Sequence, residues 1–186
     1  MRHVHIALTA TLLLFCSQNV TASFIDHPVH SQHWTKKYDR HFKKYSKRYF
    51  GPLFDWHWFK AQAIAESGLN HKAESIVGAR GLMQIMPGTF GDISKKNPHF
   101  TELDKPHWNI AAGIYYDRTL YRKIKNAPAQ DKLYMTFASY NAGYGRILNA
   151  SKRTGNKEKN WGEIKKYLPK ETRGYVHRIR RLMGEH

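Results

Sequence analysis

The residues best suited to chemistry lie in one stretch of the chain, AQAIAESGLNHKAESIVGARGLMQIMP at positions 61–87. An apolar helical run delivers one acid, Glu66, at its end, and Gly68 then stops the helix because glycine takes the left-handed conformation that closes a helix C-terminus. A carboxylate here lies at the negative end of the helix dipole and beside apolar neighbours, and both effects raise its pKa. A carboxyl group that stays protonated near neutral pH can act as a general acid.

The second half of this stretch, GARGLMQIMP at positions 78–87, combines glycines with methionine and glutamine side chains. Glycine allows close approach of the backbone, and the side chains are typical of an apolar cleft with a few placed polar groups. Sequence spacing does not place the other acids, Glu74, Asp92 and Glu171, relative to Glu66.

Four separated motifs occur in a fixed order: Glu66-Ser67, GLMQIMP at 81–87, SYNAG at 139–143 and ETRGYV at 171–176. Together they resemble the lytic transglycosylase domain of the soluble (SLT) type in the lysozyme-like superfamily. The segment WNIAAG at 108–113 matches a further, usually structural, part of that family. The resemblance implies an all-α, lysozyme-like transglycosylase domain with a groove between its helical lobes.

The resemblance also implies a chemistry that needs one carboxyl group, where ordinary glycosidases use two. Glu66 would protonate the oxygen between N-acetylmuramic acid and N-acetylglucosamine, and the N-acetyl group of the muramic acid would assist at C1. Glu66 would then remove the proton from the 6-hydroxyl of the same sugar, which closes a 1,6-anhydro ring without consuming water.

Further family roles carry over to the positions that match its motifs. Ser75 is expected near the catalytic acid, Tyr140 is expected to orient its carboxyl group, and Asn141 is expected beside it in the cleft. The other expected substrate-binding residues are Met83, Gln84, Met86, Glu171 and Tyr175. Simpler roles remain open, since Met83 and Met86 have the spacing of core residues and Tyr140 with Asn141 could form a helix end with a buried ring. Glu171 could pair on the surface with Arg173 or Lys170.

Helical periodicity accounts for most of the remaining chain, and no alternating strand pattern is present. An aromatic face formed by Trp34, Tyr38, Phe42, Tyr45 and Tyr49 predicts a first helix with a basic back, which Gly51-Pro52 ends. The further helices are expected at 54–67, from about 87 to 95, and at 108–124, 131–141, 144–151, 161–168 and 169–183, with Pro169 in a first helical turn.

The N-terminal residues 1–22 are typical of a secretory signal peptide, with an apolar region and small residues before Ser23. Residues 23–33 are expected to form a flexible lead and residues 34–186 the transglycosylase domain. The signal predicts export across the inner membrane to the periplasm. A lipid anchor at Cys16, the only cysteine, and an uncleaved membrane anchor are alternatives.

The chain of 186 residues has 31 lysines and arginines against 14 acids, a formal net charge of +17. Such a charge favours polyanionic partners. We expect peptidoglycan glycan strands as the main partner, with envelope or secretion-apparatus proteins and peripheral membrane contact as further candidates. An exported protein is not expected to bind nucleic acid.

No cofactor or metal is predicted. The twelve histidines are scattered and lack zinc-helix spacing with a third ligand, although His27, His30 and His33 could bind a metal weakly. A chelator effect reversed by zinc would overturn this prediction. Two other function classes stay open, namely a hydrolytic lysozyme-type muramidase and a non-catalytic wall-binding or envelope-assembly protein.

Overall fold

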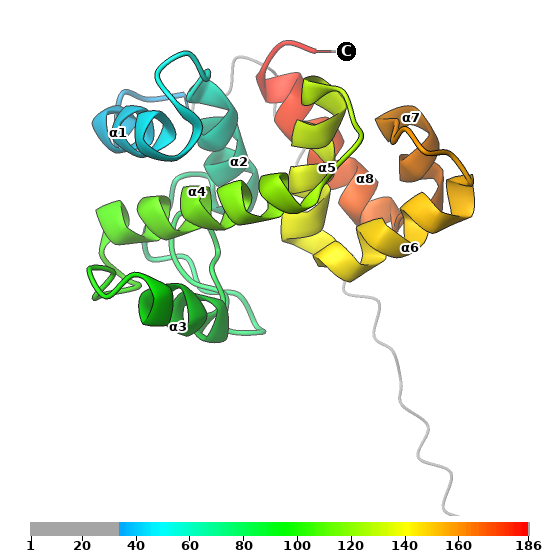
Figure 1. Cartoon of the computed structure of the whole chain (residues 1–186). Coiled ribbons are helices and arrows are strands. Elements are labelled where there is room, and N and C mark those ends of the chain that lie inside the picture. Colours follow the sequence, from blue (N-terminus) through cyan, green and yellow to red (C-terminus); the bar gives the residue numbers. More distant parts are fainter. Residues whose placement is uncertain (1–33, 186) are drawn as a thin grey trace, which may run out of the picture.

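A computed structural model describes residues 34–185 and shows helices joined by loops (Figure 1). The helices are α1 (Asp39–Phe50), α2 (His57–Ser67), α3 (Pro87–Lys96), α4 (Pro106–Lys123), α5 (Ala129–Ala142), α6 (Tyr144–Thr154), α7 (Trp161–Ile164), the 3-10 helix η1 (Lys165–Tyr167) and α8 (Lys170–Leu182). No strand forms within 34–185, where β-type pairing is limited to isolated bridges around Arg80. The predicted all-α class is confirmed.

One continuous core joins the helices, and it fixes the position of the last turn of α2. The helix α4 packs against both α1 and α5, while α8 packs against α2 and α5. Figure 1 shows α4 crossing the molecule, with α6 and α7 on the side opposite α1. The fully buried side chains come from most of these elements and include Phe42, Phe59, Leu82, Ile110, Met135 and Val176.

The first helix is shorter than its aromatic pattern predicts. It begins at Asp39 because Tyr38 has a left-handed backbone (φ 68°), which breaks the helical path between Trp34 and the rest of the aromatic face. Trp34 and Tyr38 still pack against the core. Asp39 also forms an ion pair with the buried Lys60, which ties α1 to α2.

The helix that carries Glu66 begins at His57 rather than Phe54, after the turn that follows Gly51. The carboxylate of Asp55 accepts a hydrogen bond from the backbone N–H of His57 (3.0 Å) and so satisfies one of the free donors at the helix start. The helix ends as predicted, since Gly68 has a left-handed backbone (φ 60°) and donates its N–H to the carbonyl of Ile64 at 2.9 Å.

Near the C-terminus, the single helix predicted over 161–168 divides into α7 and the 3-10 turn η1. Pro169 has an extended backbone (φ −54°, ψ 148°) and stands just before α8 instead of in its first turn. The predicted signal peptide (1–22), Cys16 and the lead (23–33) lie outside the described residues, and the proposed start of the domain at residue 34 stays a prediction. None of the helices between residues 34 and 185 combines the length and apolarity needed to span a membrane.

Candidate active site

Glu66 occupies the last turn of α2, partly buried and in direct contact with a residue from the far end of the chain. The hydroxyl of Tyr175, on α8, donates a hydrogen bond to Glu66 Oε1 at 2.6 Å. Tyr175 is itself 2% exposed, so packing fixes the direction of this hydroxyl. The structure therefore joins the first and last of the four sequence motifs.

Burial raises the pKa of Glu66 to about 7, while the hydrogen bond from Tyr175 and the positive charge of Arg178 act in the opposite direction. The sequence-based expectation of a raised pKa agrees with this value. Burial, followed by the nearby Glu66, raises the pKa of the Tyr175 hydroxyl well above its usual range. Tyr175 consequently keeps its proton and remains a donor to Glu66.

The loop between α2 and α3 folds back on Glu66 through short-range pairing. Arg80 and Ile85 exchange two backbone hydrogen bonds of 3.0 Å, and the N–H of Gly81 donates to the carbonyl of Ala73 at 2.8 Å. Ser67, the neighbour of Glu66, donates its hydroxyl to the carbonyl of Leu82 at 2.9 Å. Ser67 thus connects the acid of the first motif to the second motif.

Asn109 of α4 holds the same loop from beneath. Its Oδ1 accepts the N–H of Met83 at 2.8 Å, and its Nδ2 donates to the carbonyls of Arg80 (2.9 Å) and Leu103 (3.2 Å). Gly81 must be glycine here, since it has φ +77° and an added Cβ would lie 2.4 Å from Asn109 Nδ2. The segment at 108–113 therefore has the structural role that was expected of it.

The structure corrects the prediction that the side chain of Met83 binds substrate. Its side chain is 0% exposed and packs so closely on α4 that a Cβ on Gly113 would lie 2.8 Å from it. Met83 is a core residue, the simpler of the two roles considered for it, and its side chain does not line a sugar site. Met86, by contrast, is 42% exposed at the edge of the loop.

Tyr140 also differs from its expected role. Its hydroxyl donates to the carbonyl of Met83 at 2.8 Å, so that it holds the loop, and the residue bonded to Glu66 is Tyr175. Burial and the proximity of Glu66 raise the pKa of Tyr140 well above its usual range, which places it in the same environment. Its ring meets that of Tyr116 edge-on at 5.4 Å between centroids.

The remaining predicted residues fall into two groups. Ser75 and Gln84 shape the loop: Ser75 Oγ accepts the N–H of Ala79 at 2.9 Å, and Gln84 Nε2 donates to the carbonyls of Ala73 (3.1 Å) and Gly81 (2.9 Å). Asn141 and Glu171 are exposed at the end of α5 and the start of α8. Within residues 34–185 Glu171 forms no ion pair with Lys170 or Arg173, although its charge does act on Arg178.

Two buried polar residues behind Glu66 were missed by the sequence analysis. Asp117 of α4 is 0% exposed and accepts a hydrogen bond from Gln62 Nε2 at 3.3 Å. Burial chiefly, and Glu66 in addition, raise the pKa of Asp117 well above its usual value, while the hydrogen bond from Gln62 lowers it. Gln62 lies one helical turn before Glu66, and Asp117 follows Ile110 and Ile114 on the apolar side of its helix. A polar residue on the apolar side of a helix is the sequence signal that could have identified Gln62 and Asp117.

A cavity of about 250 Å³ lies between α3 and α4, beside the tyrosine pair. Thr89, Asp92 and Tyr116 contribute to its lining, and Tyr116 is the residue that contacts Tyr140. The arrangement provides aromatic surface next to hydroxyl and carboxylate groups, a combination suited to sugars. No cluster of three or more histidine, cysteine, aspartate or glutamate residues that could hold a metal occurs in residues 34–185.

A helical lysozyme-like fold with one acid at a helix end defines the class, and the comparisons with known proteins define the family. The family described as "Transglycosylase SLT domain" matches residues 42–161, and the chain belongs to this family.

Curated relatives include membrane-bound lytic murein transglycosylase F from Vibrio vulnificus (strain YJ016), which is 34% identical over 120 residues. The same enzyme from Actinobacillus succinogenes is 36% identical over 137 residues. These matches cover 62% and 72% of this chain but only 22% and 26% of the relatives. The chain thus spans about a quarter of the length of the curated relatives it matches.

Solved structures give the same result for the fold. The 70 kDa soluble lytic transglycosylase from Escherichia coli matches with a TM-score of 0.66 and 30% identity, over 81% of this chain and 25% of that one. A complex of the 70 kDa soluble lytic transglycosylase with bulgecin A matches with a TM-score of 0.65 and 31% identity, over 77% of this chain and 23% of that one.

Proposed function

We propose that this chain is a lytic transglycosylase that cleaves the β-1,4 bond between N-acetylmuramic acid and N-acetylglucosamine in peptidoglycan and forms 1,6-anhydromuramic acid. The observation that carries the proposal is the Glu66–Tyr175 pair, a carboxyl group with a pKa of about 7 held by a buried hydroxyl. Membership of the SLT family and the names of the relatives support the substrate class.

In the first half of the reaction, Glu66 donates its proton to the glycosidic oxygen as the bond from that oxygen to C1 breaks. Because Tyr175 occupies Oε1, the other carboxyl oxygen is the one that can carry this proton toward the sugar. The carbonyl oxygen of the muramic acid N-acetyl group forms a bond to C1 and stabilises the positive charge that develops there.

In the second half, the Glu66 carboxylate removes the proton of the 6-hydroxyl while that oxygen bonds to C1 and displaces the N-acetyl oxygen. Tyr175 and Arg178 favour the carboxylate at this stage, since both act to lower the pKa of Glu66. A pKa near the working pH suits a group that must first give and then take a proton. No water enters the product.

Substrate contacts are proposed for the exposed or partly buried members of the predicted set, namely Ser75, Gln84, Met86, Asn141 and Glu171. Tyr140 would act indirectly, because it fixes the carbonyl of Met83 and therefore the loop that carries Gln84. The cavity beside Tyr116 offers a place for a neighbouring sugar of the same strand.

The proposed place of action is the periplasm, within the cell envelope, where the chain would remodel or turn over the wall. The relatives named as membrane-bound enzymes support an envelope location for the family. Contacts with envelope or secretion-apparatus proteins and with the membrane surface stay predictions from the signal peptide and the basic charge.

The decisive experiment digests purified sacculi with the wild type and with the variant Glu66→Gln, followed by mass spectrometry of the products. We expect anhydro products from the wild type and at least about a 100-fold loss of rate in the variant, because the amide neither donates nor accepts the proton. Glu74→Gln is the matched control, since Glu74 is an exposed acid in the same loop, and it should keep its activity.

The same digest separates the alternatives. Products heavier than the anhydro form by one water would show a hydrolytic muramidase that uses the same acid. Binding to sacculi without any cleavage by the wild type would show a non-catalytic wall-binding protein, and undiminished cleavage by Glu66→Gln would remove Glu66 from its assigned role.

A further inference from the structure

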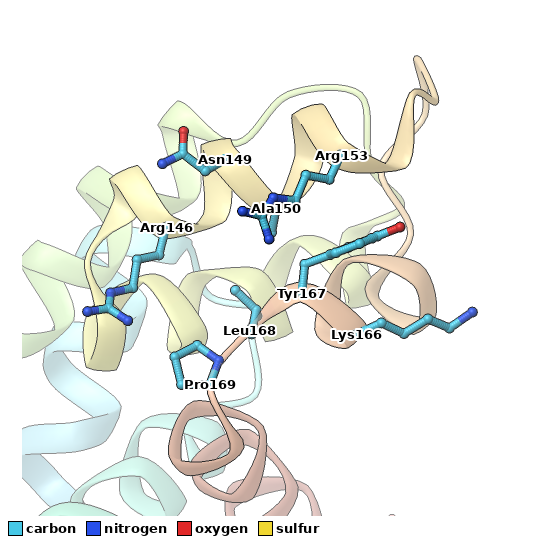
Figure 2. A pocket seen from close by; sticks show the side chains of 8 residues that line it. All are labelled: Arg146, Asn149, Ala150, Arg153, Lys166, Tyr167, Leu168 and Pro169. Carbon is cyan, nitrogen blue, oxygen red and sulfur yellow. The ribbon is translucent and has the colours of Figure 1, made fainter.

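A basic hollow that the proposed reaction does not use lies between α6 and the segment from η1 to α8. Figure 2 shows the side chains that line it, and its volume is about 440 Å³. The helix α6 contributes Arg146, Asn149 and Arg153, and the opposite side is formed by residues 166–169. The hollow therefore has two arginines on the α6 side and Lys166 on the other, and its apolar lining comes from Ala150, Leu168 and Pro169.

Among the residues that the structure describes, the positive charges of this hollow have no salt-bridge partner. Its lining contains two arginines and Lys166 but no carboxylate, and within residues 34–185 none of these three cations takes part in an ion pair. Arg146 and Arg153 are seven residues apart, which places them on one face of α6 about 10 Å apart along its axis. In Figure 2 both extend from α6 along the hollow, whereas Lys166 points away from Arg146.

The floor of the hollow suits a peptide better than an isolated ion. Ala150 and Leu168 are buried beneath it, and the ring of Tyr167 is 45% exposed at its edge. A guanidinium group binds a carboxylate through two parallel hydrogen bonds. Two such groups beside apolar and aromatic surface fit a short chain with more than one carboxylate.

The hollow and the candidate active site adjoin the same helix, α8. Pro169, in its wall, leads into α8, which carries Glu171 and Tyr175. The helix α6 follows Asn141 after a turn at Gly143. Tyr175, which contacts Glu66, lies six residues after Pro169, which corresponds to about 9 Å along the axis of α8. The peptide branch of a strand held at Glu66 is long enough to span that length of helix.

We infer that the hollow between α6 and residues 166–169 binds the acidic stem peptide of the glycan strand, with Arg146 and Arg153 holding its free carboxylates. The inference rests on the proposed function, because it places the peptide branch of the same substrate. It assigns to this chain a preference for strands that carry peptides over strands that do not.

The first test compares cleavage of peptide-bearing strands with cleavage of the same strands after an amidase has removed the peptides. The wild type should prefer peptide-bearing strands in kcat/KM, and Arg146→Gln combined with Arg153→Gln should reduce this preference by about tenfold while the rate on bare strands is unchanged. The control replaces Arg122 and Lys152 by glutamine, which removes equal charge from exposed positions outside the hollow, and it should behave as the wild type.

The second test does not depend on catalysis. Nuclear magnetic resonance titration of a free stem peptide into the Glu66→Gln variant should shift the signals of α6 and of residues 166–169. The shifts should disappear when Arg146 and Arg153 are also replaced and when the carboxylates of the peptide are amidated. If the wild type cleaves neither substrate, the proposed function fails, and this titration alone still decides whether the hollow binds the peptide.

Three outcomes would overturn the inference: no preference for peptide-bearing strands in the wild type, an unchanged preference in the double arginine variant, or no shifts in the titration. The variant's fold is checked by circular dichroism, since both arginines are exposed. Binding to phosphatidylglycerol vesicles that depends on Arg146 and Arg153, together with failure to bind the peptide, would assign the hollow to a membrane surface instead.

Discussion

Opposing effects set the pKa of Glu66, and burial is the largest of them. Burial favours the protonated acid, whereas the hydroxyl of Tyr175 stabilises the carboxylate, and the pKa of about 7 is the result of both. Arg178 adds to the effect of Tyr175, and behind the site burial also raises the pKa of Asp117 well above its usual value. The groups around Glu66 therefore determine the pH range in which this acid keeps its proton.

Removing the hydroxyl of Tyr175 should move that range upward. Without its donor the carboxylate is less stable, so the pKa of Glu66 rises further and the loss of activity with increasing pH, which begins near 7 in the wild type, should shift by about one pH unit to higher pH in Tyr175→Phe. The pH profile of kcat/KM on soluble glycan strands measures this shift. Tyr140→Phe is the control, because its hydroxyl contacts Met83 and not Glu66, and its profile should stay in place. A profile that is equally unmoved in Tyr175→Phe would contradict the assigned role.

Sequence reasoning identified Glu66 from the end of its helix and from the four motifs, and the apolar residues before it correctly indicated burial, which is the main cause of its raised pKa. It expected Tyr140 to orient the acid, whereas the hydroxyl bonded to Glu66 is that of Tyr175, because which hydroxyl reaches the acid depends on how α8 packs on α2 across 109 residues of sequence. Sequence reasoning also left open whether Met83 is buried, because spacing alone does not show which side of a loop faces α4.

At the scale of elements, the site depends on the loop between α2 and α3, which buries Leu82, Met83 and Ile85 in the core. Asn109 on α4 and Ser67 on α2 hold it by hydrogen bonds to its backbone, and Tyr140 on α5 adds a third contact. Three helices thus position one loop. The end of α2 could be predicted at Gly68, because glycine often adopts the left-handed conformation that ends a helix. The left-handed conformation of Tyr38, which shortens α1, could not be predicted from its residue type.

Asn109→Ala should destabilise the fold and loosen this loop. It leaves the N–H of Met83 and the carbonyl of Leu103 without their bonds to Asn109, while the carbonyl of Arg80 keeps its bond from the N–H of Ile85, and the loss should cost about 2–4 kcal/mol in the free energy of unfolding. Urea denaturation measures the loss, and faster hydrogen exchange at Met83 locates it.

The control is Asn97→Ala at the end of α3, where one hydrogen bond to Ile93 is lost and about 1 kcal/mol is expected. Equal losses in the two variants would show that Asn109 has no special hold on the loop.

At the scale of the whole molecule, the net charge of +17 acts at a distance on any acidic polymer. Exposed basic residues on α1 contribute to it: Arg40, Lys43, Lys44, Lys47 and Arg48. This placement is consistent with a solvated basic helix and with a surface that docks on the cell wall. Composition predicted the positive charge, but it did not identify the partner to which the charge binds.

Attraction of this kind should weaken as salt screens it. The fraction of protein that sediments with sacculi should fall as NaCl rises from about 0.05 to about 0.5 M, because the screening length shortens over this range to a few ångströms. Sacculi with amidated carboxylates are the control and should show little dependence on salt. The same dependence on both materials would mean that the acidic peptides are not the target of the charge.

The loop around the active site is held by hydrogen bonds from Ser67, Asn109 and Tyr140, and the sequence has no cysteine between residues 34 and 185. No disulfide bond therefore holds this loop in shape. Thiol reductants should leave this part of the chain intact, and it can reach its native form without any oxidative folding machinery.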